Sequence, residues 1–228
     1  MSVSFDGTAT CILGPNGAGK STLMRLATGQ LRPAAGRITH GDLTLSSSTR
    51  REWARHVGWM PQDIPVAPGM TVSDQVAYVG WLHGLSAKDA RTFTAASIEK
   101  VGLGSLADRR VSELSGGQRR RVGLASGIVH RPPYVFLDEP TAGLDPRQRD
   151  RFAAVLQSVA EHSRVVVSTH QTEHLHKTYD RIVVLEHGKL AFSGTTEEFI
   201  ALSILPSHAE QASHINSAYA VLVGEGDL

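Results

Sequence analysis

The sequence has few of the features that would tie it to a membrane or to an oxidising compartment. Cysteine occurs once in 228 residues, at Cys11, so no internal disulfide can form. Cys11 lies in an apolar stretch, which predicts a small buried side chain rather than a reactive thiol. Apolar runs such as Val165–Val167 are far shorter than the roughly 18 residues that span a bilayer.

A large excess of one charge is also lacking. The formal net charge is +1, so overall charge gives no argument for nucleic acid or for an anionic membrane surface. No Lys or Arg precedes Lys20, so the N-terminus lacks the basic start of a signal peptide. With 41% hydrophobic residues the composition suits a globular chain with a core, and we expect it to be soluble and cytoplasmic.

The order of sequence patterns predicts an α/β core. Thr8–Leu13 is typical of a strand, Gly14–Gly19 of a loop and Lys20–Gly29 of a helix, and Ile38–Leu45 alternates as a half-exposed strand does. A second block contains a helix at Arg147–His162 and predicted strands at Tyr134–Asp138, Arg164–Thr169 and Arg181–Glu186. Such alternation predicts a parallel sheet that binds ligands at the carboxyl ends of its strands.

A helical insert interrupts this core from about Asp63 to Arg131. Apolar residues at helical spacing predict two amphipathic helices between Thr71 and Gly102, with no strand between them. From about Pro206, weaker patterning predicts one terminal helix.

The stretch Gly14-Pro-Asn-Gly-Ala-Gly-Lys-Ser21 matches the phosphate-loop pattern G-x-x-x-x-G-K-[ST]. Glycines let successive backbone N–H groups turn toward phosphate oxygens, and the following helix points its positive end at them. Lys20 is predicted to neutralise the β- and γ-phosphates, and the Ser21 hydroxyl to bind Mg²⁺. An ordinary glycine turn is the alternative. The residues predicted to bind the nucleotide here are Asn16, Gly17, Gly19, Lys20, Ser21 and Thr22.

Two acids, Asp138 and Glu139, end the predicted strand that begins at Tyr134. Acids at the carboxyl end of a buried strand lie where a phosphate loop also opens, so both can face one nucleotide. Asp138 is predicted to bind Mg²⁺, and Glu139 to orient and deprotonate the attacking water. The alternative is that they only end the strand before Pro140.

The stretch Leu114-Ser-Gly-Gly-Gln118 has two readings. Ser115 and Gln118 form a capping-box pattern, which would only start a helix. Two adjacent glycines weaken a first helical turn, however, and a close backbone approach to a phosphate explains them.

Taken together, these motifs resemble the nucleotide-binding subunit of ABC (ATP-binding cassette) transporters over nearly the whole sequence. Gly14–Ser21 is similar to the Walker A loop, Gln62 to the Q-loop, Leu114–Gln118 to the signature motif and Val135–Glu139 to the Walker B motif. Ala142–Asp145 resembles the D-loop, and His170 the switch histidine. The stretch that begins at Pro68 resembles cassettes of drug, antibiotic or lipid exporters with separate permeases.

The resemblance implies a P-loop NTPase core, a mixed or parallel sheet with helices on both faces, and an inserted α-helical subdomain. It implies one ABC ATPase domain over 1–228, in which 1–62 and 132–205 form the core, 63–131 the helical signature subdomain and 206–228 a C-terminal tail. The N-terminal strand of the antiparallel subdomain is expected to be missing.

The resemblance also implies the remaining roles. Two cassettes would dimerise head to tail, so that Ser115, Gly117 and Gln118 bind a nucleotide held by the partner. Gln62 would contact the metal and the attacking water, His170 would bind the γ-phosphate, and Asp145 would act across the dimer. The catalytic set is therefore Glu139, His170 and Gln62, and the metal set Ser21, Gln62 and Asp138. ATP and Mg²⁺ are the expected ligands.

The predicted function is an ATPase that drives transport, with export as the predicted direction. Its partners would be a second, identical or homologous ATPase subunit and separate transmembrane permease subunits, at the inner face of the cell membrane. The alternatives are a soluble ABC-type ATPase acting on nucleic acid or the ribosome, and a weakly active nucleotide-binding regulator. The chain lacks the coiled-coil tract and the second cassette of the soluble members, and it keeps Glu139 and His170, which a regulator would not need.

Two other readings are rejected. His170-Gln-Thr-Glu-His174 fits the zinc pattern H-x-x-E-H, but His170 directly follows a predicted strand instead of lying on a helix. Arg119–Arg121 suggests nucleic acid, but near-zero net charge favours a solvated or nucleotide-facing helix edge, and no direct nucleic-acid contact is expected.

The base of the nucleotide has no predicted partner. In ABC cassettes an aromatic residue well before the Walker A loop stacks on adenine. Only thirteen residues precede Gly14, and Phe5 lies in a context typical of a core strand. We expect either that the native protein starts upstream of Met1 or that this cassette binds adenine differently.

Overall fold

The computed structural model describes residues 1–170, 175–205 and 210–223. Its centre is a six-stranded sheet in the order β4-β5-β6-β1-β7-β8, in which β8 alone runs antiparallel to its neighbour. The strands are β1 (Ala9–Leu13), β4 (Val57–Met60), β5 (Tyr134–Asp138), β6 (Arg164–Thr169), β7 (Arg181–Glu186) and β8 (Lys189–Thr195). The prediction of a mixed, mainly parallel sheet is confirmed, and β5, β6 and β7 have the predicted bounds.

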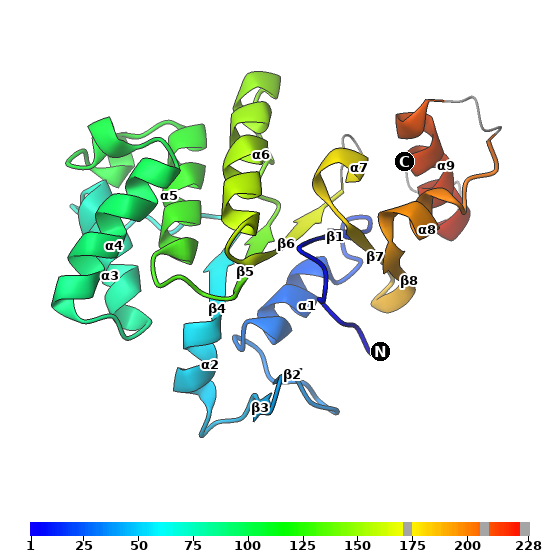
Figure 1. Ribbon diagram of the computed structural model, residues 1–228, viewed down its shortest axis with the longest axis horizontal. Coiled ribbons are helices and arrows are strands. Elements are labelled where there is room, and N and C mark those ends of the chain that lie inside the picture. Colours follow the sequence, from blue (N-terminus) through cyan, green and yellow to red (C-terminus); the bar gives the residue numbers. More distant parts are fainter. Residues whose placement is uncertain (171–174, 206–209, 224–228) are drawn as a thin grey trace.

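Helices cover both faces of this sheet, because side chains along each central strand alternate between two cores. On one face Ile12, Phe136 and Val166 pack against helices α1 (Lys20–Ala27) and α2 (Arg50–His56). The neighbouring strand residues, such as Val135 and Val167, point to the opposite face. That face is covered by α6 (Pro146–Ala160), α7 (Leu175–Thr178), α8 (Thr196–Ile200) and α9 (Gln211–Val223) (Figure 1).

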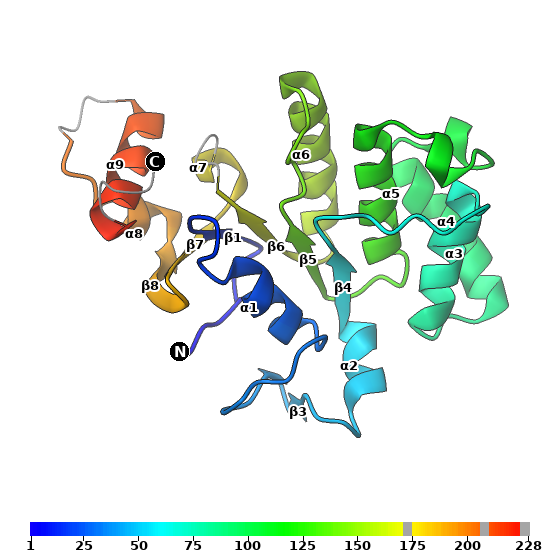
Figure 2. The same cartoon turned by 180° about the vertical axis from the view of Figure 1, so that it is seen from behind.

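The predicted helical insert lies at the β4 end of the sheet (Figures 1 and 2). It contains α3 (Val72–Leu82), α4 (Ala87–Lys100), the 3-10 turns η1 (Gly104–Leu106) and η2 (Val111–Glu113), and α5 (Gly116–Ile128). A capping box at Thr71 and Asp74 starts α3, and Ser86 caps α4. Gly58 of β4 and Gly127 of α5 bring strand and helix into close contact, since a Cβ on Gly58 would collide with the carbonyl oxygen of Gly127.

Two sequence predictions need correction. Ile38–Leu45 is not one strand but a short hairpin of β2 (Thr39–His40) and β3 (Leu43–Thr44), because Gly41, with a φ of 54°, lets the chain reverse. Phe5 lies in no strand, although its ring packs edge-on against Phe136 at 5.6 Å between centroids.

Two other expectations can be checked directly. Cys11 is fully buried, as predicted, and burial raises the pKa of its thiol. Over the three described segments, no helix combines the length and the apolar character that a membrane crossing requires.

Candidate nucleotide site

The phosphate loop leaves the carboxyl end of β1 and leads directly into α1. Gly17 and Gly19 have φ values of 82° and 98°, which L side chains rarely adopt. Gly14 has no room for a side chain, because a Cβ there would meet the carbonyl oxygen of Leu185. The amide of Gly188, in the turn between β7 and β8, donates to the carbonyl oxygen of Ala18 at 3.1 Å and fixes the loop against the sheet.

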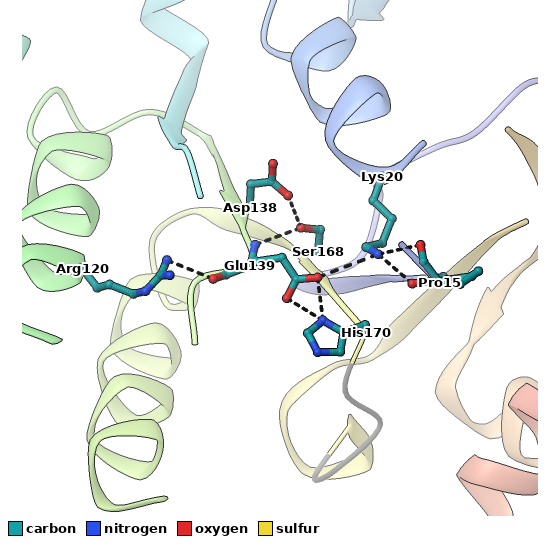
Figure 3. A network of polar contacts seen from close by, with 8 residues as sticks. Pro15, Lys20, Arg120, Asp138, Glu139, Ser168 and His170 are labelled. Atoms are coloured by element: carbon teal, nitrogen blue, oxygen red, sulfur yellow. Dashed lines mark hydrogen bonds and ion pairs between the residues drawn. The ribbon is translucent and has the colours of Figure 1, made fainter. Parts of the chain in front are cut away.

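Lys20 is the first residue of α1 and is buried. Its ammonium donates to the carbonyl oxygens of Gly14 at 2.7 Å and Pro15 at 3.1 Å, and lies 3.8 Å from a carboxylate oxygen of Glu139. Burial lowers the pKa of Lys20, while the charges of Glu139 and Asp138 act in the opposite direction. The loop's own carbonyls therefore orient the ammonium toward the acidic end of β5 (Figure 3).

The two acids at the end of β5 have different surroundings, although both are buried. Asp138 accepts a short hydrogen bond of 2.5 Å from the hydroxyl of Ser168 on the adjacent strand β6. Glu139 instead reaches His170, whose Nδ1 lies 3.0 and 3.2 Å from its two carboxylate oxygens. Since a carboxylate only accepts, Nδ1 carries a proton in this contact.

The backbone of Glu139 is in the left-handed region, with a φ of 46°. Such a conformation costs a non-glycine residue of order 1–3 kcal/mol and persists only where its surroundings impose it. Here the Glu139 amide donates to both the hydroxyl and the carbonyl oxygen of Ser168, at 3.0 and 3.2 Å. Its own carbonyl accepts from the Ala142 amide and from Arg120 of α5.

A cavity of about 400 Å³ opens in front of these groups. It brings together nine of the predicted site residues from four separate segments, so these residues face one space. They are Asn16, Gly17, Gly19, Lys20, Ser21, Thr22, Gln62, Glu139 and His170, and Ala18 and Ala142 complete the lining. Asp138 does not line the cavity but lies behind it.

The signature residues Ser115, Gly117 and Gln118 are absent from this lining. They start α5, where Ser115 accepts from the Gln118 amide at 3.3 Å and the Gln118 side chain accepts from the Ser115 amide at 2.9 Å. The capping box is therefore formed, and it leaves Ser115 and Gly116 exposed. Within one chain, the two groups of predicted nucleotide-binding residues do not share a cavity.

Sequence reasoning missed Ser168 and Arg120. Ser168 precedes His170 by two residues on β6, and its position at the end of a strand beside β5 could have indicated it. Arg120 gave no such signal, because its two acceptors, the carbonyl oxygens of Gln62 and Glu139, are far apart in sequence.

Three further predictions concern Asp145, the zinc pattern that begins at His170, and metal binding. Asp145 is the N-cap of α6 and accepts from the Gln148 amide at 2.9 Å. His170 lies just after β6, as predicted, whereas His174 of the rejected zinc pattern falls outside the described residues. Throughout the described parts of the chain, no three His, Cys, Asp or Glu side chains are grouped as a metal site would need.

Comparison with known proteins gives the family. The ABC transporter family profile matches residues 3–142. The daunorubicin/doxorubicin resistance ATP-binding protein DrrA of Streptomyces peucetius is 38% identical over 82% of this chain and 57% of its own length. The Fe(3+) ions import ATP-binding protein FbpC of Rhizobium etli is 36% identical over 87% of this chain and 56% of its own length.

Solved structures of ABC transporter cassettes have a similar fold. A bacterial ABC transporter cassette whose structure is dimeric superposes with a TM-score of 0.76, at 22% identity, over 85% of this chain and 88% of that one. The chain spans little more than half the length of the two curated relatives, DrrA and FbpC. The profile match covers the phosphate loop, the signature helix and both acids, and on this evidence the chain belongs to the ABC transporter family.

Proposed function

We propose that this chain is the ATP-binding subunit of an ABC transporter, which binds Mg-ATP at a head-to-tail dimer interface and hydrolyses it to drive transport. The observation that carries the proposal is the position of Glu139. Its carboxylate lines the same cavity as the phosphate loop and lies 3.8 Å from Lys20 and 3.0 Å from His170. A buried carboxylate beside a phosphate-binding lysine is suited to accept a proton from water next to a phosphate.

Binding of the triphosphate depends on α1. The glycine loop leaves the first N–H groups of this helix without a side-chain cap, and no acid lies in its first turn. Such a helix end attracts anions. Lys20, already oriented by Gly14 and Pro15, would donate to the β- and γ-phosphate oxygens, and Thr22 and the loop amides would bind the rest.

In the reaction, a water oxygen forms a bond to the γ-phosphorus while the bond from that phosphorus to the bridging oxygen breaks, which gives ADP and inorganic phosphate. Glu139 orients the water and accepts its proton. Gln62, whose exposed side chain lines the cavity, contacts the same water. His170 positions the Glu139 carboxylate through Nδ1–H, and a bond from His170 to a γ-phosphate oxygen requires an N–H at Nε2 as well.

The residues present fit Mg²⁺, which takes oxygen ligands and is commonly bound by one or two carboxylates together with phosphates and water. Ser21 and Gln62 supply oxygens to the cavity lining, and Asp138 supplies a carboxylate behind it. When bound, the ion neutralises charge on the β- and γ-phosphates. Asp138 would act through water, since it does not line the cavity.

The proposed dimer explains why the two groups of site residues do not meet in one chain. Ser115, Gly117 and Gln118 would contact a nucleotide held by the phosphate loop of a second ATPase subunit. The exposed first turn of α5 supports this arrangement, because nothing in the described chain covers Ser115 or Gly116.

We further propose separate transmembrane permease subunits and a position at the inner face of the cell membrane. An exposed apolar group on α3, formed by Tyr78, Trp81 and Leu82, supports contact with a further protein. Export is the proposed direction, on the likeness to a drug-resistance protein. The division into a core (1–62 and 132–205), a helical subdomain (63–131) and a tail (206–228) is part of the same proposal.

The test is Glu139→Gln, which keeps the size of the side chain but cannot accept a proton in the same way. Loss of a positioned base costs roughly 10²–10⁴ in rate, so hydrolysis should fall by that factor while ATP binding persists. The matched control is Glu186→Gln, the same change at the end of β7, a strand end that does not line the cavity. Turnover within about threefold of the native rate in Glu139→Gln would remove Glu139 from this role.

A further inference from the structure

Three consecutive arginines, Arg119 to Arg121, lie on α5 directly after the signature motif. Each of their guanidinium groups donates to main-chain carbonyl oxygens. Arg119 donates to Ser112 at 2.8 Å, and Arg121 donates to Val101 at 3.2 Å and Gly102 at 3.0 Å. All three of these acceptors belong to the helical insert, so Arg119 and Arg121 brace the insert internally.

Arg120 makes a different connection. A single nitrogen, Nη1, donates to the carbonyl oxygens of Gln62 and Glu139, both at 3.1 Å. Gln62 begins the loop into the insert, and Glu139 directly follows β5, so one side chain of α5 joins two segments of the cavity lining. Figure 3 shows the bond from Arg120 to the Glu139 carbonyl oxygen. Burial lowers the pKa of the guanidinium, opposed by the charges of Asp63 and Glu139.

The contact matters because its acceptor, the carbonyl oxygen of Glu139, belongs to a backbone in an unfavourable conformation. Glu139 has a φ of 46°, and two groups donate to its carbonyl oxygen, the Ala142 amide and Arg120. The first belongs to the turn that follows Glu139, whereas Arg120 comes from the helical insert. Any movement of α5 relative to β5 must therefore either carry this carbonyl along or break the bond.

We propose that Arg120 is a positioning residue: it fixes the strained backbone of Glu139 and ties the orientation of the carboxylate to the position of α5. The inference rests on the proposed function, because Glu139 is taken as the base that deprotonates water. Displacing a base by about 1 Å lowers the rate by up to about 10²-fold, whereas the phosphate contacts of Lys20 are left in place. Arg120 thus acts on turnover rather than on nucleotide affinity.

The first experiment compares Arg120→Met, which keeps an unbranched apolar stem, with Arg121→Met as the matched control and Arg120→Lys as the conservative variant. In the full chain, with its partners, Arg120→Met should lower kcat by about tenfold or more while KM changes by less than about twofold. Arg121→Met should keep kcat within about threefold, and Arg120→Lys should recover most of the loss, since an ammonium can also donate to two carbonyls. Equal losses in Arg120→Met and Arg121→Met, or no loss in Arg120→Met, would overturn the proposal.

The second experiment does not depend on hydrolysis and so separates this inference from the proposed function. Amide hydrogen exchange should rise several-fold over residues 138–142 in Arg120→Met and stay unchanged there in Arg121→Met. Unchanged exchange over 138–142 in Arg120→Met overturns the positioning role even if turnover falls. If the native chain binds but never hydrolyses ATP, the proposed function fails, and the exchange result still decides whether Arg120 fixes this backbone.

Discussion

The helices α1 and α5 both carry glycine at their N-termini, but the two N-termini are capped differently. The start of α1 has Gly19 as its N-cap, in the left-handed region, with no side-chain hydrogen bond to the first turn. The start of α5 is closed by the reciprocal bonds of Ser115 and Gln118. The first lines a cavity with Glu139 and His170, and the second is exposed and lines no part of it.

The difference separates two tasks. An uncapped helix end with a buried lysine attracts a phosphate within one chain. A capped end has fewer free N–H groups, so its contribution to a partner's nucleotide would come from the side chains of Ser115 and Gln118 and the backbone of Gly117. We therefore expect α1 to determine nucleotide affinity, and α5 to determine whether a nucleotide bound by a partner can be hydrolysed.

The largest expected effect comes from damaging one helix start at a time. Lys20→Ala should remove ATP binding and hydrolysis together, because it deletes a charge-assisted donor that no neighbour replaces. Ser115→Arg should leave ATP binding within about threefold of the native affinity, since Ser115 lies outside the cavity, but it should abolish hydrolysis by blocking the partner's site. Equilibrium titration and steady-state turnover of each variant measure these outcomes.

Mixing the two variants provides the control. In a head-to-tail dimer, one subunit of each kind forms one intact site, so a one-to-one mixture should regain about a quarter of native turnover if subunits pair at random. If each site were built within one chain, the mixture would be no more active than either variant alone. That result would contradict the division of roles in which α1 binds a nucleotide and α5 acts on the nucleotide of the partner.

The sequence predicted the buried central strands well and the elements around them less completely. Tyr134–Asp138 and Arg164–Thr169 were predicted with their observed bounds, because buried parallel strands are continuous apolar runs. The four-residue strand β4 and the seven-residue helix α2 were missed, since short elements give little periodicity. The antiparallel strand β8 was missed because its residues are mostly not buried and form no continuous apolar run. The hairpin at Gly41 was read as one strand because alternation continues across its turn.

The site residues were also predicted only in part. Lys20 and Glu139 follow local motifs that indicated a shared site, and His170 was indicated by the resemblance to ABC cassettes; all three line one cavity. The contacts of Ser168 and Arg120 join segments far apart in the chain, and both involve backbone groups of Glu139, which every residue type possesses. A pattern of side chains cannot indicate an interaction in which one partner is a main-chain N–H or C=O group.

A smaller effect should follow from pH, and it acts on the helical insert. His83 and His130 stack with centroids 3.9 Å apart and donate to the carbonyl oxygens of Ala54 and Val57, at 2.6 and 3.2 Å. These bonds attach the insert to α2 and β4. Burial lowers the pKa of both rings, and that of His130 falls from 6.5 to about 3, with the neighbouring His83 contributing.

The lowered pKa values determine how the free energy of unfolding changes with pH. The folded pKa lies below the unfolded one, so protons bind the unfolded chain first, and stability is lost as the pH falls below about 6.5. One such group costs about 2 kcal/mol between pH 6.5 and pH 5, which lowers the melting temperature of a chain of this size by about 4–8 °C. His130→Gln, which keeps a donor for Val57, should flatten this dependence, whereas His162→Gln, at an exposed position just after α6, should not. An unchanged slope of melting temperature against pH in His130→Gln would contradict the assignment.

The smallest expected effect concerns the base of the nucleotide. Among the described residues that line the cavity, none is Phe, Tyr or Trp, and the ring of Phe5 already packs against Phe136. Stacking on an aromatic side chain is worth about 1–3 kcal/mol per base, so this chain should discriminate weakly between purines. ATP and GTP should compete for the site with affinities within about tenfold of each other, and inorganic tripolyphosphate should compete as well, because binding depends on the start of α1. A competition titration measures all three ligands against one fluorescent nucleotide. A preference for ATP above about tenfold would mean that another residue recognises adenine, and that α1 is not the main determinant of affinity.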